Sequence, residues 1–164
     1  MNELKELLQL LDAEIGVLQR KLSVLQEIAQ CIRQGQMDDL EELVQRGAEL
    51  ERRGESLESE MRDSCVRIAA SCGMAPDEVT IGRLAEVLDG PDAIALQDRR
   101  ERLVLVVQEL RDAAAVTSLL VRTALDINER LLTAILGPED EGETYCPEGE
   151  LVRERQGTTF QHSV

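Results

Sequence analysis

Four cysteines and one histidine carry the most distinctive side-chain chemistry in this chain of 164 residues. Cys65 and Cys72 are seven residues apart, a spacing that places them on one face of a helix. A zinc site at this pair would need two more Cys or His ligands nearby, and a catalytic cysteine needs a base such as histidine beside it. The only histidine is His162, so we expect neither kind of site. Cys31, Cys65 and Cys72 fall in predicted helices and are expected to be reduced, buried thiols.

Paired carboxylates are the other residues that could do chemistry, as general acids and bases. However, Asp38, Asp39, Glu41 and Glu42 fall in the first turn of a predicted helix, where they offset the helix dipole. Glu-x-x-His pairs for a di-iron centre and glycine-rich phosphate loops are both absent from the sequence. We therefore predict that the protein is not an enzyme and needs no metal or cofactor.

The charge balance excludes further classes of function. The chain has 33 acidic and 18 basic residues and a formal net charge of -15, which argues against binding to nucleic acid or to an anionic membrane. No segment approaches the roughly 20 apolar residues of a membrane span. The start, with Glu3 and Glu6, lacks the basic and apolar pattern of a signal peptide. We expect a cytoplasmic protein.

The elements that position these residues are long helices. In the first segment, apolar residues recur with gaps alternating between four and three, which is the heptad pattern of helices that pack side by side. The ladder consists of Leu4, Leu8, Leu11, Ile15, Leu18, Leu22, Leu25, Ala29 and Ile32. A helix from about Asn2 to Gln34 should end where Gly35 can adopt the left-handed conformation.

A second helix follows after a short connection, so the two helices should form an antiparallel hairpin. Asp38 is the expected N-cap, with Glu41 in the capping-box position. The second ladder is Leu40, Leu43, Gly47, Leu50, Gly54, Leu57, Met61, Cys65, Ile68 and Cys72. Two glycines within it indicate that a neighbouring backbone or a bulky side chain approaches closely at Gly47 and Gly54; deliberate flexibility is the alternative.

A short crossover helix is expected from Ile81 to Leu88, capped by Thr80, before a last long helix from about Asp92 to Leu136. The last helix has a seam of Leu103, Val106, Leu110, Ala113, Thr117, Leu120, Ala124, Ile127, Leu131 and Ala134. A second stripe of Val104, Val107, Ala114, Val121, Leu125 and Leu132 widens its apolar face. Such width suits packing against both earlier helices, or it leaves part of the face open for a partner.

The predicted fold is all-α: three long helices plus one short crossover helix in an antiparallel, coiled-coil-like bundle spanning 1–136. Residues 137–164 form an acidic tail that is expected to be flexible, with isolated apolar residues. Both aromatic residues of the chain, Tyr145 and Phe160, lie in it. Such a tail is typical of segments that fold on binding a partner.

With the helices placed, the chain resembles the FlgN family of flagellar export chaperones. The resemblance rests on the turn GQMDDLEEL from Gly35 to Leu43, the run LESEMR from Leu57 to Arg62, the crossover from Gly73 to Leu88, and Thr144-Tyr145 with Pro147 and Gly149. It implies binding of the hook-filament junction proteins FlgK and FlgL, protection of them from premature association, and delivery to the flagellar type III export gate.

The resemblance also implies where partners bind. Cargo contact falls on the end of the last helix and on the tail, at Leu131, Leu132, Ile135, Leu136, Leu151 and Val152. The tail tyrosine of the family is linked to docking on the export gate component FlhA, which here assigns that role to Tyr145. Alternatively, Leu131 and Ile135 close the bundle and Tyr145 folds back onto it.

A different class of function stays open at this point. A structural or adaptor coiled-coil protein would use the same seams for permanent self-association, for example as a homodimer, and its tail would serve only solubility. Such a scaffold should tolerate removal of the tail, whereas a chaperone should stay folded and lose its cargo.

Overall fold

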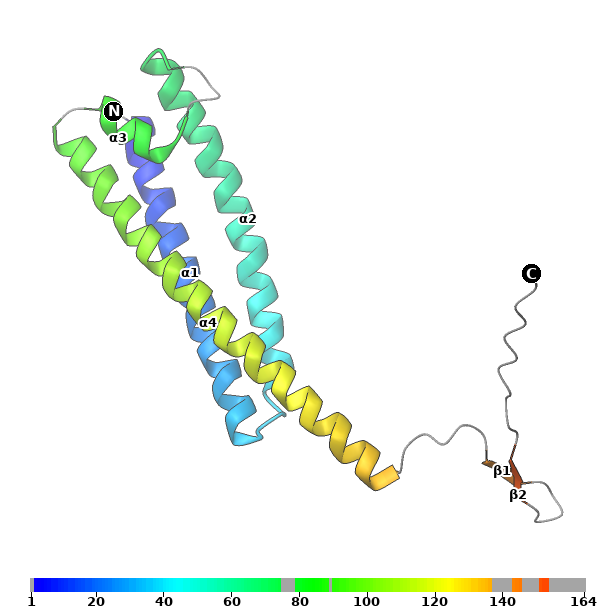
Figure 1. Ribbon diagram of the computed structural model, residues 1–164. Coiled ribbons are helices and arrows are strands. Elements are labelled where there is room, and N and C mark those ends of the chain that lie inside the picture. Colours follow the sequence, from blue (N-terminus) through cyan, green and yellow to red (C-terminus); the bar gives the residue numbers. More distant parts are fainter. Residues whose placement is uncertain (1, 75–78, 89, 137–142, 146–150, 154–164) are drawn as a thin grey trace, which may run out of the picture. The chain divides into compact units, whose positions relative to one another are not determined.

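The computed structural model describes residues 2–74, 79–88, 90–136, 143–145 and 151–153 (Figure 1). They form the helices α1 (Asn2–Gln34), α2 (Leu40–Ser71), α3 (Ile81–Val87) and α4 (Pro91–Leu136), and the strands β1 (Glu143–Tyr145) and β2 (Leu151–Arg153). The chain divides into two compact units, residues 1–122 and 123–164. The predicted fold of three long helices and one short crossover helix is confirmed; the two strands were not predicted.

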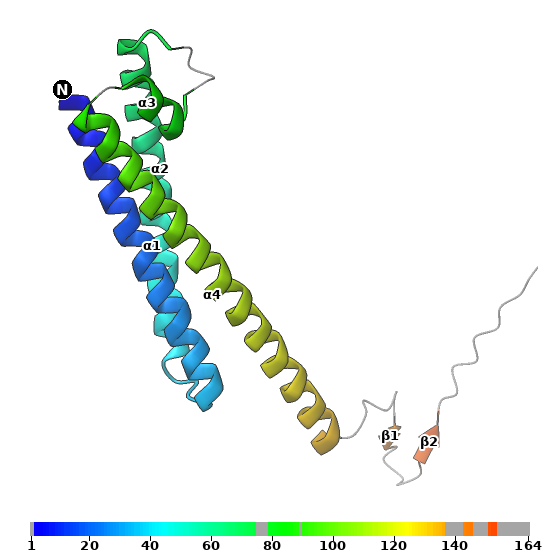
Figure 2. The ribbon, with the colours of Figure 1, turned by 60° about the vertical axis from the view of Figure 1, so that its left-hand side comes forward.

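α1 and α2 form an antiparallel hairpin, which both views of the ribbon show (Figures 1 and 2). Gly35 has a φ of 69°, the left-handed conformation expected after α1. The prediction that Asp38 caps α2 is wrong, because the N-cap is Asp39. Asp39 already has helical backbone angles, and its side chain accepts no hydrogen bond from the free N–H groups of the first turn.

α1 is buried along more than the predicted ladder. Leu7, Val17 and Val24 are buried although they lie off it, whereas the ladder residues Leu8 and Leu22 are only partly buried. The reason is that α1 has neighbours on two sides. Its Val24 comes within 3.8 Å of where a Cβ on Gly47 of α2 would lie, and its residues Ile15 and Leu18 pack against Val106 of α4.

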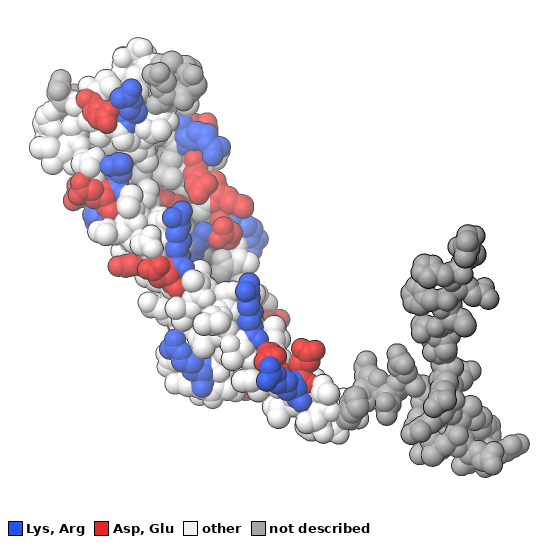
Figure 3. Space-filling model, viewed as in Figure 1, with Lys and Arg blue, Asp and Glu red and all other residues white. Residues whose placement is uncertain are grey.

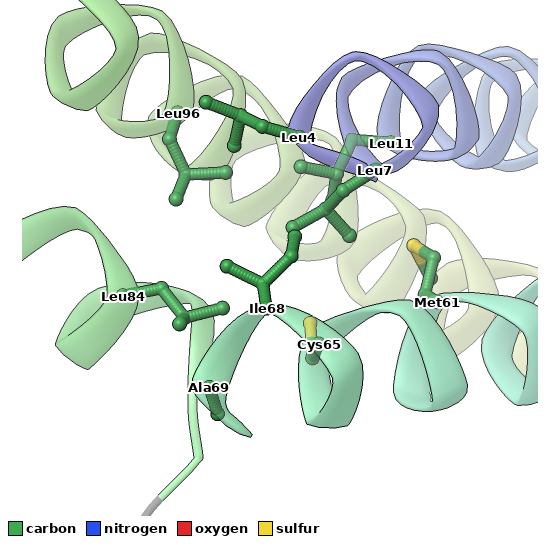
Figure 4. Packing of buried hydrophobic residues seen from close by; sticks show 9 residues of the cluster. All are labelled: Leu4, Leu7, Leu11, Met61, Cys65, Ile68, Ala69, Leu84 and Leu96. Atoms are coloured by element: carbon green, nitrogen blue, oxygen red, sulfur yellow. The ribbon is translucent and has the colours of Figure 1, made fainter. Parts of the chain in front are cut away.

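The largest core cluster joins all four helices at one end of the first unit. It comprises Leu4, Leu7, Leu11, Met61, Cys65, Ile68, Ala69, Leu84 and Leu96. Figure 4 shows Leu84 pointing from α3 toward Ile68 of α2, and Leu96 of α4 beside Leu4 of α1. Leu7, Leu84 and Leu96 are fully buried, so α3 covers this end of the bundle, as its sequence predicts.

α3 is positioned by local signals that the sequence contains. The Thr80 hydroxyl oxygen accepts a hydrogen bond from the backbone N–H of Arg83 at 3.1 Å, which confirms the predicted cap. Gly73 and Gly90, on either side of the crossover, have φ values of 71° and 75°. Pro76 of the same crossover lies outside the described residues.

α4 buries far less of its apolar surface than its sequence suggests. Only Leu96, Val106 and Thr117 of this helix are buried, and stripe residues such as Val104 and Leu125 are exposed. The interpretation that the full width of this face packs against both earlier helices is therefore wrong. The other interpretation, an apolar face left partly open, describes the helix: beyond the cluster around Leu96, the buried residue Val106 packs against α1 alone.

Polar contacts help to fix α4 beside α1. The Arg99 guanidinium Nη2 lies 3.0 Å from the Asp12 carboxylate. Farther along, the Thr117 hydroxyl lies 3.3 Å from the backbone carbonyl oxygen of Leu25. These contacts pair increasing residue numbers on both helices, so α1 and α4 run in the same direction (Figure 2).

Candidate functional site

The last part of α4 presents an exposed apolar surface in the second unit. Leu131, Leu132, Ile135 and Leu136 are between 54% and 78% exposed. Their spacing of i, i+1, i+4 and i+5 places them on one side of the helix. None of these four residues belongs to a buried cluster of the described part of the chain.

Two further residues extend this surface. Leu125 and Ile127 are 63% and 51% exposed, so every large apolar residue in the α4 segment 123–136 is more than half exposed. Single exposed leucines are normal on proteins, whereas large contiguous apolar patches are typical of interaction surfaces. An ion pair between Arg130 and Asp126, at 3.0 Å, lies within the same segment. We call residues 125–136 the exposed α4 end.

The tail residues singled out in the sequence lie on β1 and β2. The strands pair antiparallel, with Tyr145 opposite Leu151 and Thr144 opposite Val152. The sequence analysis treated Tyr145, Leu151 and Val152 as separate points along the tail, and the strand pairing brings them together. The rest of the predicted tail, including Cys146 and Phe160, lies outside the described residues.

A second notable group is a buried carboxylate between α1 and α2, which the sequence analysis missed. Glu14 is only 4% exposed, and its Oε2 has no hydrogen-bond partner. Burial raises the pKa of Glu14, the nearby Lys21 charge lowers it by less, and Glu58 and Glu51 raise it further. The signal that could have found it is Gly54, whose missing Cβ leaves room for Lys21 and Glu14.

Lys21 links this buried carboxylate to the surface. Its Nζ lies 2.7 Å from the Glu51 carboxylate of α2, so the ammonium group forms an ion pair between the two helices. The same positive charge favours the ionised form of Glu14 and thereby lowers the pKa of Glu14. The Ser64 hydroxyl is also fully buried without a partner. Nothing about this group points to a substrate, and we assign it to the packing of the hairpin rather than to catalysis.

Of the three cysteines that were expected to be buried, only Cys65 is buried. Cys65 is buried, and burial raises the pKa of its thiol, so it behaves as a small hydrophobic residue. Cys31 is half-buried, and the prediction that Cys72 is buried is wrong, because Cys72 is exposed as the C-cap of α2. Among the described residues, no three His, Cys, Asp or Glu side chains form a group that could hold a metal ion.

The charge distribution shows no large surface of one sign on the face that carries α4. Acidic and basic side chains lie there in small groups with uncharged surface between them (Figure 3). None of the described helices is long and apolar enough to cross a membrane. The exposed α4 end carries charged side chains, among them Arg130 and Asp126, beside its exposed apolar residues.

A comparison with protein families places these features in context. The sequence model of the FlgN protein family matches residues 1–153. The chain belongs to the FlgN family. No significant match was found among curated proteins or among solved structures. The match covers all four helices and both strands.

Membership in the FlgN family indicates a flagellar export chaperone that acts on flagellar proteins. FlgN proteins form a chaperone family. The exposed α4 end and the β1–β2 pair both lie within the matched region, so they belong to the part of the chain that is typical of FlgN proteins.

Proposed function

We propose that this FlgN-family protein binds the hook-filament junction proteins FlgK and FlgL in the cytoplasm, prevents their premature association and delivers them to the export gate. The observation that carries this proposal is the exposed α4 end. A chaperone needs an uncovered apolar surface in its free state, because it must cover an apolar stripe of its cargo.

The cargo contact is assigned to Leu131, Leu132, Ile135 and Leu136, together with Leu151 and Val152. The four α4 residues present aliphatic side chains at helical spacing, which suits an amphipathic cargo helix. Tyr145 is assigned to docking on FlhA, because an aromatic ring with a polar tip is a frequent anchor of protein interfaces.

Calorimetric titration of the full chain against purified FlgK and FlgL from the same source tests the proposal. We expect Leu132→Asp to weaken cargo binding by roughly tenfold or more. Val44→Asp is the matched control, because Val44 of α2 is 60% exposed and Leu132 is 57% exposed. The control should bind within about twofold of the unmodified protein.

The outcome also separates the chaperone from a coiled-coil adaptor. If the folded, unmodified chain binds neither junction protein, the chaperone proposal for these cargos fails. If Leu132→Asp and Val44→Asp bind equally well, the cargo site lies elsewhere. Loss of self-association in Leu132→Asp without any cargo binding by the unmodified chain would favour an adaptor.

A further inference from the structure

A second surface with the features of a binding site lies in the first unit and shares no residue with the surface assigned above. It is an open groove of about 420 Å³ between α1 and α4. Leu22 of α1 and Ala113 and Val116 of α4 contribute its apolar lining. Val116 is 49% exposed, so an apolar occupant would remove surface from water on both partners.

The two helices that form the groove are held in place by contacts beside it. Thr117 is buried, and its hydroxyl lies 3.3 Å from the Leu25 carbonyl oxygen of α1. About two to three helical turns earlier, Ile15 and Leu18 pack against Val106. The groove is therefore present in the free chain, and an occupant need not separate the helices to enter it.

Charged residues of opposite sign lie toward the two ends of the groove. Glu109 precedes Thr117 by 117 − 109 = 8 residues on α4, and Arg33 follows Leu25 by 33 − 25 = 8 residues on α1. Because Thr117 and Leu25 are in contact and the helices run in the same direction, the acidic and the basic residue each lie roughly 12 Å from that contact, on opposite sides of it.

The charged side chains of Arg33 and Glu109 are not paired with other described residues of the bundle. In the part of the chain that the structure describes, the side chains of Arg33 and Glu109 make no hydrogen bond and no ion pair. Asp112, beside Glu109 in the lining, accepts a hydrogen bond only from Gln108 of its own helix, at 3.0 Å. Arg33 also offsets the dipole at the end of α1, but that role leaves its guanidinium free to bind a carboxylate.

We propose that this groove seats an amphipathic helix of the exported protein, a role that rests on the proposed function. The occupant has an apolar stripe for the groove, a Lys or Arg near the Glu109 and Asp112 end, and an Asp or Glu near Arg33. A helix of about 16 residues covers the distance between the two ends, since each residue adds about 1.5 Å. Opposite charges at the ends fix its direction, and the apolar lining supplies affinity.

The test is calorimetric titration of the full chain with purified FlgK and FlgL, using variants of the groove. Val116→Asp should weaken binding by about tenfold or more, because it puts a charge into the apolar lining. The double variant Arg33→Glu, Glu109→Lys should weaken binding by about three- to tenfold and reduce its dependence on salt. Melting followed by circular dichroism should show that both variants stay folded.

Matched controls carry the same changes outside the groove. Val44→Asp, and Arg53→Glu with Glu55→Lys, alter exposed residues of α2 and should bind within about twofold of the unmodified chain. Groove variants that bind like these controls, while Leu132→Asp loses cargo, would overturn the groove proposal and leave the proposed function standing.

Two other outcomes also overturn the groove proposal. If neither FlgK nor FlgL binds the unmodified chain, the groove proposal fails together with the proposed function. If sedimentation equilibrium shows that the unmodified chain is a dimer without cargo and that Val116→Asp is a monomer, the occupant is a second copy of this chain rather than an exported helix.

Discussion

Gly54 of α2 leaves the space that Lys21 of α1 occupies: a Cβ added at Gly54 would lie 3.2 Å from Nζ of Lys21. The same Nζ lies 2.7 Å from the Glu51 carboxylate, and Glu14 lies buried beside it. At Gly54 the hairpin therefore packs around the ion pair of Lys21 and Glu51 rather than around apolar side chains.

Replacing Gly47 and Gly54 of α2 by alanine should distinguish the gain in stability from higher helix propensity from the cost of a close contact. Gly47→Ala should stabilise the protein by about 0.5 to 1 kcal/mol, because the new Cβ would meet Val24 at an ordinary contact distance of 3.8 Å. Gly54→Ala should stabilise it by less, since Lys21 must shift. Urea unfolding measures both, and a larger gain for Gly54→Ala would contradict this interpretation.

Glu14→Gln should raise the free energy of unfolding at pH 7. Burial raises the folded-state pKa of Glu14 above its ordinary value of 4.5, so ionised Glu14 is less favourable in the folded chain than in the unfolded one. The contribution of Glu14 to stability is therefore fully present below pH 4.5 and is lost as the pH rises through the folded pKa.

The pH dependence supplies the check for Glu14. The charged groups that act on it are Lys21 of its own helix and Glu51 and Glu58 of α2. The gain from Glu14→Gln should shrink as the pH is lowered toward 4.5 in a series of urea titrations. Glu55→Gln, an exposed residue of α2, is the control and should show no such dependence. An equal gain at every pH would rule out the assignment to ionisation.

Removal of the tail should uncouple folding from binding. A chain that ends at Gly137 retains all four helices and the buried clusters, so its helical signal should persist and its melting temperature should stay within about 2 °C. Its affinity for FlgK and FlgL should fall by roughly tenfold or more, because Leu151 and Val152 are lost. Loss of helical structure on truncation would sink the prediction.

Tyr145→Ala should affect only the export gate. Cargo affinity should stay within about twofold, whereas binding to purified FlhA should weaken by roughly tenfold or more. Phe160→Ala, which removes the other aromatic residue, is the control and should bind both partners normally. Equal loss of cargo and FlhA binding in Tyr145→Ala would show that the two surfaces are not separate.

Local signals made much of the fold predictable. Gly35, Thr80 and Gly90 end or begin helices through their own backbone conformations and hydrogen bonds, and the observed helix bounds lie within about two residues of those expected. The cap of α2 was missed because Asp38 and Asp39 are chemically equivalent candidates. Only the turn that joins the Leu40 N–H to the Met37 carbonyl places Asp39 at the N-cap position.

The candidate site was predictable in part for a different reason. Leu131, Leu132, Ile135 and Leu136 stood out through the family resemblance, but the same apolar pattern continues from Val106, which is buried. The register that places Tyr145 opposite Leu151 depends on pairing between two short segments, for which a three-residue strand carries almost no periodic signal.

The sequence by itself determined that the chain forms long amphipathic helices, where they begin and end, and that the family is FlgN, because these follow from residue order and local backbone preference. Only the tertiary structure decided which apolar residues are buried. Periodicity shows that a helix has an apolar face, but whether a neighbour covers it depends on which helices meet: Val24 is buried off the predicted ladder, and Leu125 is exposed on the predicted stripe.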